Sequence, residues 1–136
     1  MNQFNAVVTE IRSEGNLNIV KFDFAGISLS MISLELGDNI SMGSELVLAI
    51  KPSHITFAVD RGAGFDTMLS CINLVPAFIT EVRNGLLLSS ILLSIGDFVF
   101  EAIITLEASQ KMKLRAGDRV VVMLKASELS IVEVLA

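Results

Sequence analysis

Short hydrophobic runs, rich in Thr, Val, Ile and Phe, recur along the chain and are separated by Gly, Asn or Asp. Runs of this length and composition, bounded by turn-forming residues, are typical of β-strands. The pattern predicts ten strands, at 6–11, 17–24, 27–32, 46–50 and 55–59 and then at 78–82, 86–93, 98–104, 120–124 and 129–134. Only 107–114 has the pattern of a helical turn, and the shorter segment after Ser33 is expected to form an irregular or 3₁₀ turn.

The two sets of five strands belong to a repeated sequence. Ala6–Arg12 aligns with Ala77–Arg83, and four of these seven aligned pairs are identical. Further matches follow in the same order: Gly15 and Gly26 with Gly85 and Gly96, Ile32–Glu35 with Ile104–Glu107, and Gly43–Ser53 with Gly117–Ser127. Several matches in one order, with only small insertions between them, indicate a duplicated module.

Five short strands with closely spaced turns favour a small barrel of the OB type in each copy, because closure removes exposed strand edges. We therefore expect an all-β protein of two tandem five-stranded barrels, with one short helical turn per module. The copies would span 1–60 and 70–136, and a linker at 61–69 is long enough for a strand to be exchanged between them. A module of about 65 residues is marginal alone, so we expect copies and chains to share apolar surface.

Composition and charge exclude several classes of protein. Hydrophobic residues make up 52% of the chain, which excludes a disordered protein. A net charge of −5 with ten Lys plus Arg, and without Trp or Tyr, argues against binding a nucleic-acid backbone. The longest uncharged stretch, 86–96, is shorter than the ~20 residues of a membrane-spanning helix, so no membrane segment is expected. A single Cys, Cys71, and the lack of a signal peptide favour the cytoplasm.

The sequence contains few candidate catalytic residues. His54 is the only His, so neither a Ser-His or Cys-His pair nor a histidine metal cluster can be proposed. Gly62-Ala63-Gly64 lacks the third glycine of a dinucleotide-binding loop, and the chain has no P-loop motif. We therefore expect a protein that is not an enzyme, with no covalent cofactor and no direct ligands for a metal cation.

The end of the second copy resembles a known family. A Gly117-Asp118-Arg119 turn and a run of branched aliphatic residues lead into Lys125-Ala126-Ser127-Glu128-Leu129, which looks like the closing strand of the TOBE or Mop (molybdate/tungstate-binding) module. Ser70-Cys71-Ile72-Asn73 resembles that family's opening Ser-Ala-Arg-Asn motif, and Thr105 stands where the family has a Thr that begins a helical turn. The resemblance covers nearly the whole chain as two tandem copies, the arrangement called di-Mop or ModG-like.

The resemblance implies that molybdate or tungstate binds in clefts where modules from different chains meet. The corresponding oxyanion-binding residues are Ser70, Cys71, Thr105, Lys125, Ala126 and Ser127 in the second copy and Ser33, Lys51 and Ser53 in the first. Lys125 would be the charged ligand, whereas Ser70 and Thr105 would offer hydroxyls. Cys71 and Ala126 would add backbone N–H groups. Donors of these three kinds suit a tetrahedral dianion that has lost its water.

Some residues depart from the family pattern or suit a simpler role. Ile72 replaces the family's Arg, Ala108 replaces its second hydroxyl, and the first copy begins at the motif's Asn, as Asn2. Ser33 and Thr105 would also suit a plain turn cap, and a Lys at a strand end can serve solubility alone.

Two functions follow from the resemblance. The first is storage or buffering of molybdate or tungstate in the cytoplasm. The alternative is a ligand-free tandem TOBE unit for oligomerisation, or for regulation of a molybdate or tungstate transporter or regulator, and Ile72 favours it. By analogy with free-standing di-Mop proteins, a homo-oligomer is expected, with a trimer first and a dimer next.

Overall fold

The computed structural model describes residues 1–60, 62 and 68–136. The strands are β1 (Asn2–Glu14), β2 (Leu17–Phe24), β3 (Ile27–Ser33), β4 (Glu45–Ile50), β5 (Ile55–Val59), β6 (Leu74–Asn84), β7 (Leu88–Ile95), β8 (Phe98–Thr105), β9 (Arg119–Leu124) and β10 (Ser130–Val134). A 3₁₀ turn, η1 (Pro52–His54), and a helix, α1 (Leu106–Met112), complete the elements. All ten predicted strands are present, and β1 and β6 are longer than the pattern indicated.

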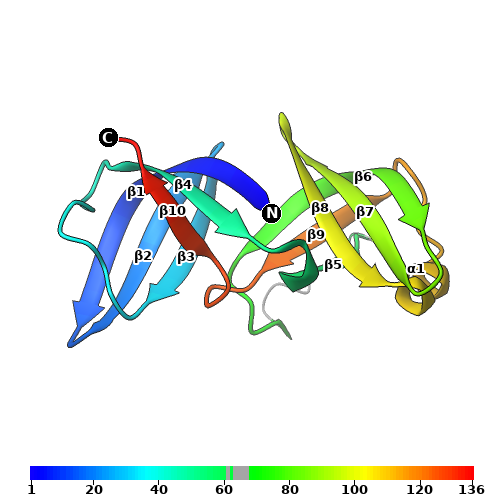
Figure 1. Ribbon diagram of the computed structural model, residues 1–136, viewed down its shortest axis with the longest axis horizontal. Helices are drawn as coiled ribbons and strands as arrows, with labels where there is room; N and C mark the ends of the chain where they lie inside the picture. The colour runs from blue at the N-terminus through cyan, green and yellow to red at the C-terminus, as the bar shows by residue number, and fades with distance from the viewer. Residues whose placement is uncertain (61, 63–67) are drawn as a thin grey trace.

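The strands form two curled five-stranded antiparallel sheets that lie side by side (Figure 1). Their orders are β10-β4-β1-β2-β3 and β5-β9-β6-β7-β8. The prediction of an all-β fold with two five-stranded barrel modules is therefore confirmed. Each sheet takes four strands from one repeat and its fifth strand from the other, because β5 pairs with β9 and β10 pairs with β4.

This strand exchange changes the meaning of the predicted module boundaries. The ranges 1–60 and 70–136 separate the two sequence repeats, but each sheet contains strands from both. The sequence left exchange open, since β5 and β10 follow matching turns in the two copies. The predicted linker at 61–69 falls largely outside the described residues.

The first strand of each repeat bends at a bulge. The register shifts between Val8 and Glu10 in β1 and between Ile79 and Glu81 in β6, which are matching positions in the two repeats. A bulge bends a strand and increases its twist, so one long strand can pair with two neighbours around a barrel. Accordingly β1 pairs with β4 through its first half and with β2 through its second half.

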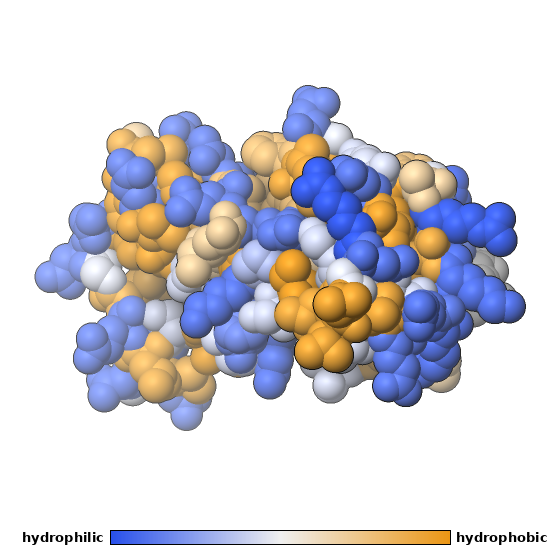
Figure 2. Space-filling model, turned by 45° about the vertical axis from the view of Figure 1, so that its right-hand side comes forward, coloured by the Kyte–Doolittle hydropathy of each residue, from blue (hydrophilic) through white to orange (hydrophobic). Residues whose placement is uncertain are grey.

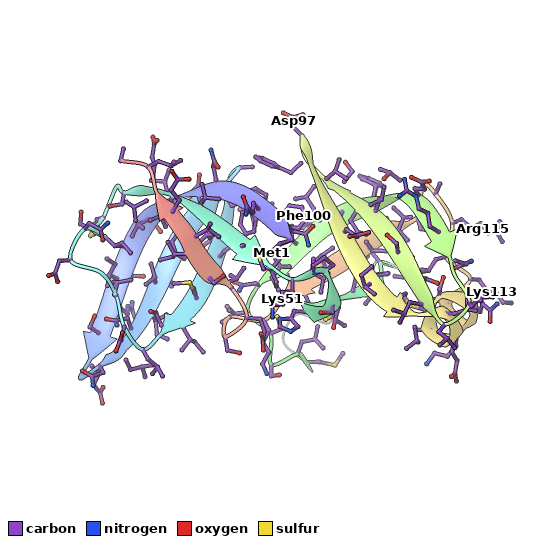
Figure 3. The ribbon with its side chains drawn as sticks, in the orientation of Figure 1. Met1, Lys51, Asp97, Phe100, Lys113 and Arg115 are labelled. Carbon is purple, nitrogen blue, oxygen red and sulfur yellow. The ribbon has the colours of Figure 1, made fainter. Side chains whose placement is uncertain are left out.

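A single hydrophobic core runs through both sheets. Four phenylalanines join the halves: the ring of Phe4 in β1 lies 5.2 Å from that of Phe100 in β8, and Phe24 in β2 lies 5.0 Å from Phe98. Figure 3 shows Phe100 at the centre of the molecule, between the two sheets. Aromatic pairs at these distances stabilise a contact beyond the area that they bury.

The helical segments agree in part with the prediction. Helix α1 begins one residue before the predicted 107–114, and Thr105 caps it by accepting a hydrogen bond from the Ala108 N–H at 3.1 Å. The segment after Ser33 forms turns without a helix, as expected. The 3₁₀ turn of the first repeat lies instead at η1, where Pro52 supplies the fixed φ that begins it. No helix among the described residues is long and apolar enough to cross a membrane.

Candidate functional site

Two asparagines clamp the halves of the molecule together. The Asn2 side chain donates to the Glu101 carbonyl at 2.9 Å and accepts from the Glu101 N–H at 2.8 Å. The Asn73 side chain bonds Ser30 in the same way, at 2.8 and 2.7 Å, and also donates to the Leu124 carbonyl at 2.7 Å. Each asparagine stands at the start of one repeat and holds the third strand of the other. The clamps bring three segments together at the centre: the start of each repeat, its Lys-containing turn and the opposite third strand.

The two Lys-containing turns have the same backbone closure and touch each other. In the first, 51–54, the His54 N–H donates to the Lys51 carbonyl; in the second, 125–128, the Glu128 N–H donates to the Lys125 carbonyl, both at 2.9 Å. The His54 Nδ1 lies 2.9 Å from the Glu128 Oε2, and both side chains are partly exposed. The turns therefore lie side by side where the exchanged strands cross from one sheet to the other. Figure 3 shows Lys51 in this central region, below Met1.

A cavity of about 530 Å³ opens beside the second turn. It lies between the end of β3 and the start of β10, the two edge strands of the first sheet. Its polar walls include Ser33, Glu35 and Ser127, and its apolar walls include Met31, Ile32, Ile40, Leu129 and Ile131. The Ile32 N–H donates to the Ala126 carbonyl at 3.0 Å, which fixes the turn against β3.

The structure groups the predicted residues differently from the sequence. The family pattern places Ser33 with Lys51 and Ser53, but the cavity joins Ser33 to Ser127. The physical reason is the strand exchange: β10 pairs with β4, so the turn before β10 lies against the first sheet. Conversely, η1 packs against β8, so Ser53 lies against the third strand of the second repeat, and Lys51 directly precedes it.

The two hydroxyls at the ends of the third strands already have local partners. Thr105 caps α1, and the Ser33 Oγ donates to the Glu35 carbonyl at 2.6 Å. The turn-cap interpretation that the sequence left open therefore describes both of them. A hydroxyl rotates, so Ser33 could still donate to a ligand if it released Glu35.

The opening segment Ser70–Asn73 lies next to the second turn. The Leu124 N–H donates to the Asn73 carbonyl at 3.1 Å, immediately before Lys125. Ser70 and Lys125 are exposed, Cys71 is partly buried with its thiol 3.6 Å from the Asn73 carbonyl, and Ile72 is 71% exposed. The structure thus places Asn73, at the end of the opening segment, beside the residue that precedes Lys125, and it places Ser127 and Ser33 at the adjoining cavity.

The ionisable groups with displaced pKa values lie away from this region, on β1 and β6. A hydrogen bond from Arg12 lowers the pKa of Glu10, and two hydrogen bonds from Arg83 lower the pKa of Glu81. Among residues 1–60, 62 and 68–136, no group of three or more His, Cys, Asp or Glu side chains could hold a metal ion.

Sequence reasoning missed the role of two pairs of residues. Asn2 and Asn73 were recognised only as motif positions, although their matching places in the two repeats are the signal of a shared structural role. His54 and Glu128 also occupy matching places, yet no sequence pattern indicates that they touch. Both contacts depend on how the repeats pack together.

Comparison with proteins of known structure gives independent support for the fold. No protein-family model and no curated protein matches the chain. Among solved structures, the chain is similar to the cytoplasmic molybdate-binding protein ModG in a form with molybdate bound, with a TM-score of 0.85 and 20% sequence identity. The similarity covers 96% of this chain and 94% of that one. At this identity the likeness establishes the fold.

Proposed function

We propose that the protein binds molybdate or tungstate and stores or buffers it in the cytoplasm, without catalysing a reaction. The observation that supports this proposal is that the 125–128 turn adjoins Asn73, where the opening segment ends, and a cavity with Ser33 and Ser127 at its edge. A similar fold in a molybdate-binding protein, which spans nearly the whole of both chains, adds support.

The donors in this region suit a tetrahedral dianion. Lys125 offers a positive charge that offsets part of the ion's charge, and Ser70 and Ser127 offer rotating hydroxyls. Backbone N–H groups of Cys71 and Ala126 would supply fixed partial charge. Because sulfate carries the same charge but is smaller, discrimination between the ions would come from the size of the closed site.

The site would be completed by further copies of the chain. Leu86 and Leu87, at the tip between β6 and β7, are 95% and 81% exposed, and Leu34, Met42 and Ile72 are also exposed. Figure 2 shows hydrophobic residues gathered in patches between hydrophilic ones on the face that it presents. Such patches on a small domain mark contact surfaces. We therefore propose a homo-oligomer, a trimer before a dimer; a monomeric mass by light scattering at micromolar concentration contradicts this.

Titration with molybdate, tungstate and sulfate, followed by calorimetry and native mass spectrometry, tests the binding function. Lys125→Ala should weaken molybdate binding by about 10- to 100-fold, because a charge-assisted hydrogen bond contributes roughly 1.5–3 kcal/mol. Lys111→Ala is the matched control, since Lys111 is an exposed lysine on α1, outside the region. Ile72→Arg should tighten binding by adding the donor that the family pattern has.

A second candidate is a ligand-free module for oligomerisation or regulation. The exposed Ile72 favours it, because an apolar side chain there gives the site no donor. Wild-type protein that takes up none of the three oxyanions at millimolar concentration, yet forms an oligomer, supports this candidate and rules out the first.

A further inference from the structure

The two Lys-containing turns match in backbone closure but differ in the donors that they can offer. Turn 51–54 reads Lys-Pro-Ser-His and turn 125–128 reads Lys-Ala-Ser-Glu. Both are closed by the hydrogen bond from the fourth residue to the lysine carbonyl. Pro52 and Ala126, the second residues of the two turns, can therefore be compared directly, because the turns around them have the same backbone hydrogen bond.

Proline has no N–H, so turn 51–54 lacks one donor that turn 125–128 has. Within the described part of the chain, neither the Ala126 N–H nor the Ser127 N–H donates to any acceptor. Unpaired backbone N–H groups in a turn are ready to receive an anion. The second turn thus offers two backbone donors beside its lysine, and the first offers one.

The strands that face the two turns also differ in charge. Ser30 of β3 and Glu101 of β8 are the matching residues that the asparagine clamps hold. The Glu101 carboxylate accepts a hydrogen bond from the Ser90 hydroxyl on β7. Strand β8, against which η1 packs, therefore carries the Glu101 carboxylate, whereas β3 carries the neutral Ser30 hydroxyl at the matching position. The hydrogen bond to Ser90 directs this carboxylate toward β7, so the missing N–H of Pro52 is the difference at the turn itself.

We propose that the two turns have separate roles: turn 125–128 binds one oxyanion per chain, and turn 51–54 binds none and supports it. This inference rests on the proposed function and adds to it the number of sites and the residue that decides between them. Pro52 removes a donor from the first turn and begins η1. His54, at the end of η1, has its Nδ1 2.9 Å from the Glu128 Oε2 and so holds that carboxylate beside the binding turn.

The decisive variant is Ala126→Pro, because the chain already accommodates proline at the matching position. The Ala126 carbonyl, which accepts from the Ile32 N–H, is kept in this variant, and only the N–H is lost. Calorimetry with molybdate should give one equivalent per chain for the wild type and a loss of at least about 10-fold in affinity for Ala126→Pro. Thermal unfolding checks that the fold is retained.

Lysine variants give a test that does not depend on Ala126→Pro folding. Lys125→Ala should lose about 10- to 100-fold in affinity, whereas Lys51→Ala should change it by less than about 2-fold. Pro52→Ala should add a second, weaker equivalent. Equal losses for the two lysine variants, two equal equivalents in the wild type, or unchanged affinity in Ala126→Pro overturn the separate roles and leave the binding function standing. A wild type that binds no molybdate overturns both proposals.

The negative charge at the edge of the cavity allows an independent test of where the anion binds. Glu35 lines the cavity beside Ser33 and Ser127 and opposes an anion there. Glu35→Gln should therefore tighten molybdate binding by about 2- to 10-fold, while Glu107→Gln, its match in the second repeat, should leave it unchanged. A tighter complex in Glu107→Gln and not in Glu35→Gln places the anion at the other turn and overturns the assignment.

Discussion

Asn2 and Asn73 hold the two halves of the molecule in the same way, but the residues packed beside them differ. Next to Asn2, Phe4, Phe24, Phe98 and Phe100 form an aromatic cluster that joins the two sheets. The positions that match these in strand register in the other half are aliphatic: Val75, Ile95, Ile27 and Leu29. Next to Asn73, the clamp has one more hydrogen bond, to Leu124.

The comparison shows which features both repeats keep after duplication and which side chains are free to differ between them. The asparagine clamps and the bulged first strands determine how one repeat fits the other, so both copies retain them. The side chains around this frame can diverge because either copy tolerates different packing of similar volume. One half is joined more by aromatic packing, and the other more by buried hydrogen bonds.

The largest expected effect comes from the aromatic cluster. Phe24 contacts three other rings, so Phe24→Ala should lower the free energy of unfolding by about 4 kcal/mol. The matching change Ile95→Ala should cost less, by roughly 1 kcal/mol, because no aromatic pair is lost. Urea unfolding of the two variants measures the difference. Equal costs contradict the view that aromatic packing distinguishes this half.

For the two asparagines, the larger loss of stability should come from the half without the aromatic cluster. Asn73 is 1% exposed and makes three side-chain hydrogen bonds to the backbone, whereas Asn2 is 8% exposed and makes two. Asn73→Ala should cost about 3 kcal/mol and Asn2→Ala about 2 kcal/mol, since each leaves buried backbone groups unpaired. Thermal and urea unfolding check the order. A larger cost at Asn2 means that the extra bond to Leu124 has no net effect.

The sequence predicted the strands well because their signals are local. Branched residues alternate or cluster between turn-forming residues, and this alone locates β2 and β3 to within a residue. The first strands were predicted too short, since the polar ends of β1, such as Asn2 and Ser13, become strand only through pairing with β4 and β2.

The strand exchange lay beyond the sequence for a physical reason. In either arrangement the closing strand follows the same turn and pairs with the same kind of strand, β4 or β9, so the local pattern is unchanged. The candidate residues could therefore be named from motifs, but which of them meet could not. Ser33 joins Ser127, and His54 joins Glu128, only because the strands cross.

A smaller effect is expected from the contact between His54 and Glu128, which joins the two turns. His54 and Glu128 have side chains that are each 37% exposed, so solvent screens their attraction. A double-mutant cycle with His54→Gln and Glu128→Gln should give a coupling free energy below about 1 kcal/mol, which falls further in high salt. Coupling well above this value shows that the contact between the two turns contributes substantially to stability.

The smallest expected effect concerns the matching carboxylates of the bulged strands. Arg83 holds Glu81 through two hydrogen bonds of 2.9 Å, whereas Glu10 has Arg12 at 2.9 Å and also Lys21 at 3.5 Å. These hydrogen bonds lower the pKa of both carboxyls. A carboxyl with a lowered pKa adds stability above its unfolded-state pKa, and this stability is lost as the pH falls through the folded-state pKa.

The arginines should therefore matter differently in the two repeats. Among the residues that the structure describes, Arg83 is the one basic partner of Glu81, so in Arg83→Gln the pKa of Glu81 should return close to its ordinary value. Arg12→Gln leaves Lys21 beside Glu10, so the pKa of Glu10 should stay partly lowered. NMR titration of the two carboxyl signals between pH 2 and 7 measures both, a range that spans the usual carboxyl pKa of about 4. If Glu10 returns to its ordinary pKa as fully as Glu81, Lys21 does not act on it in solution. The two bulged strands would then be electrostatically equivalent, and the difference between the repeats would lie in their packing and their turns.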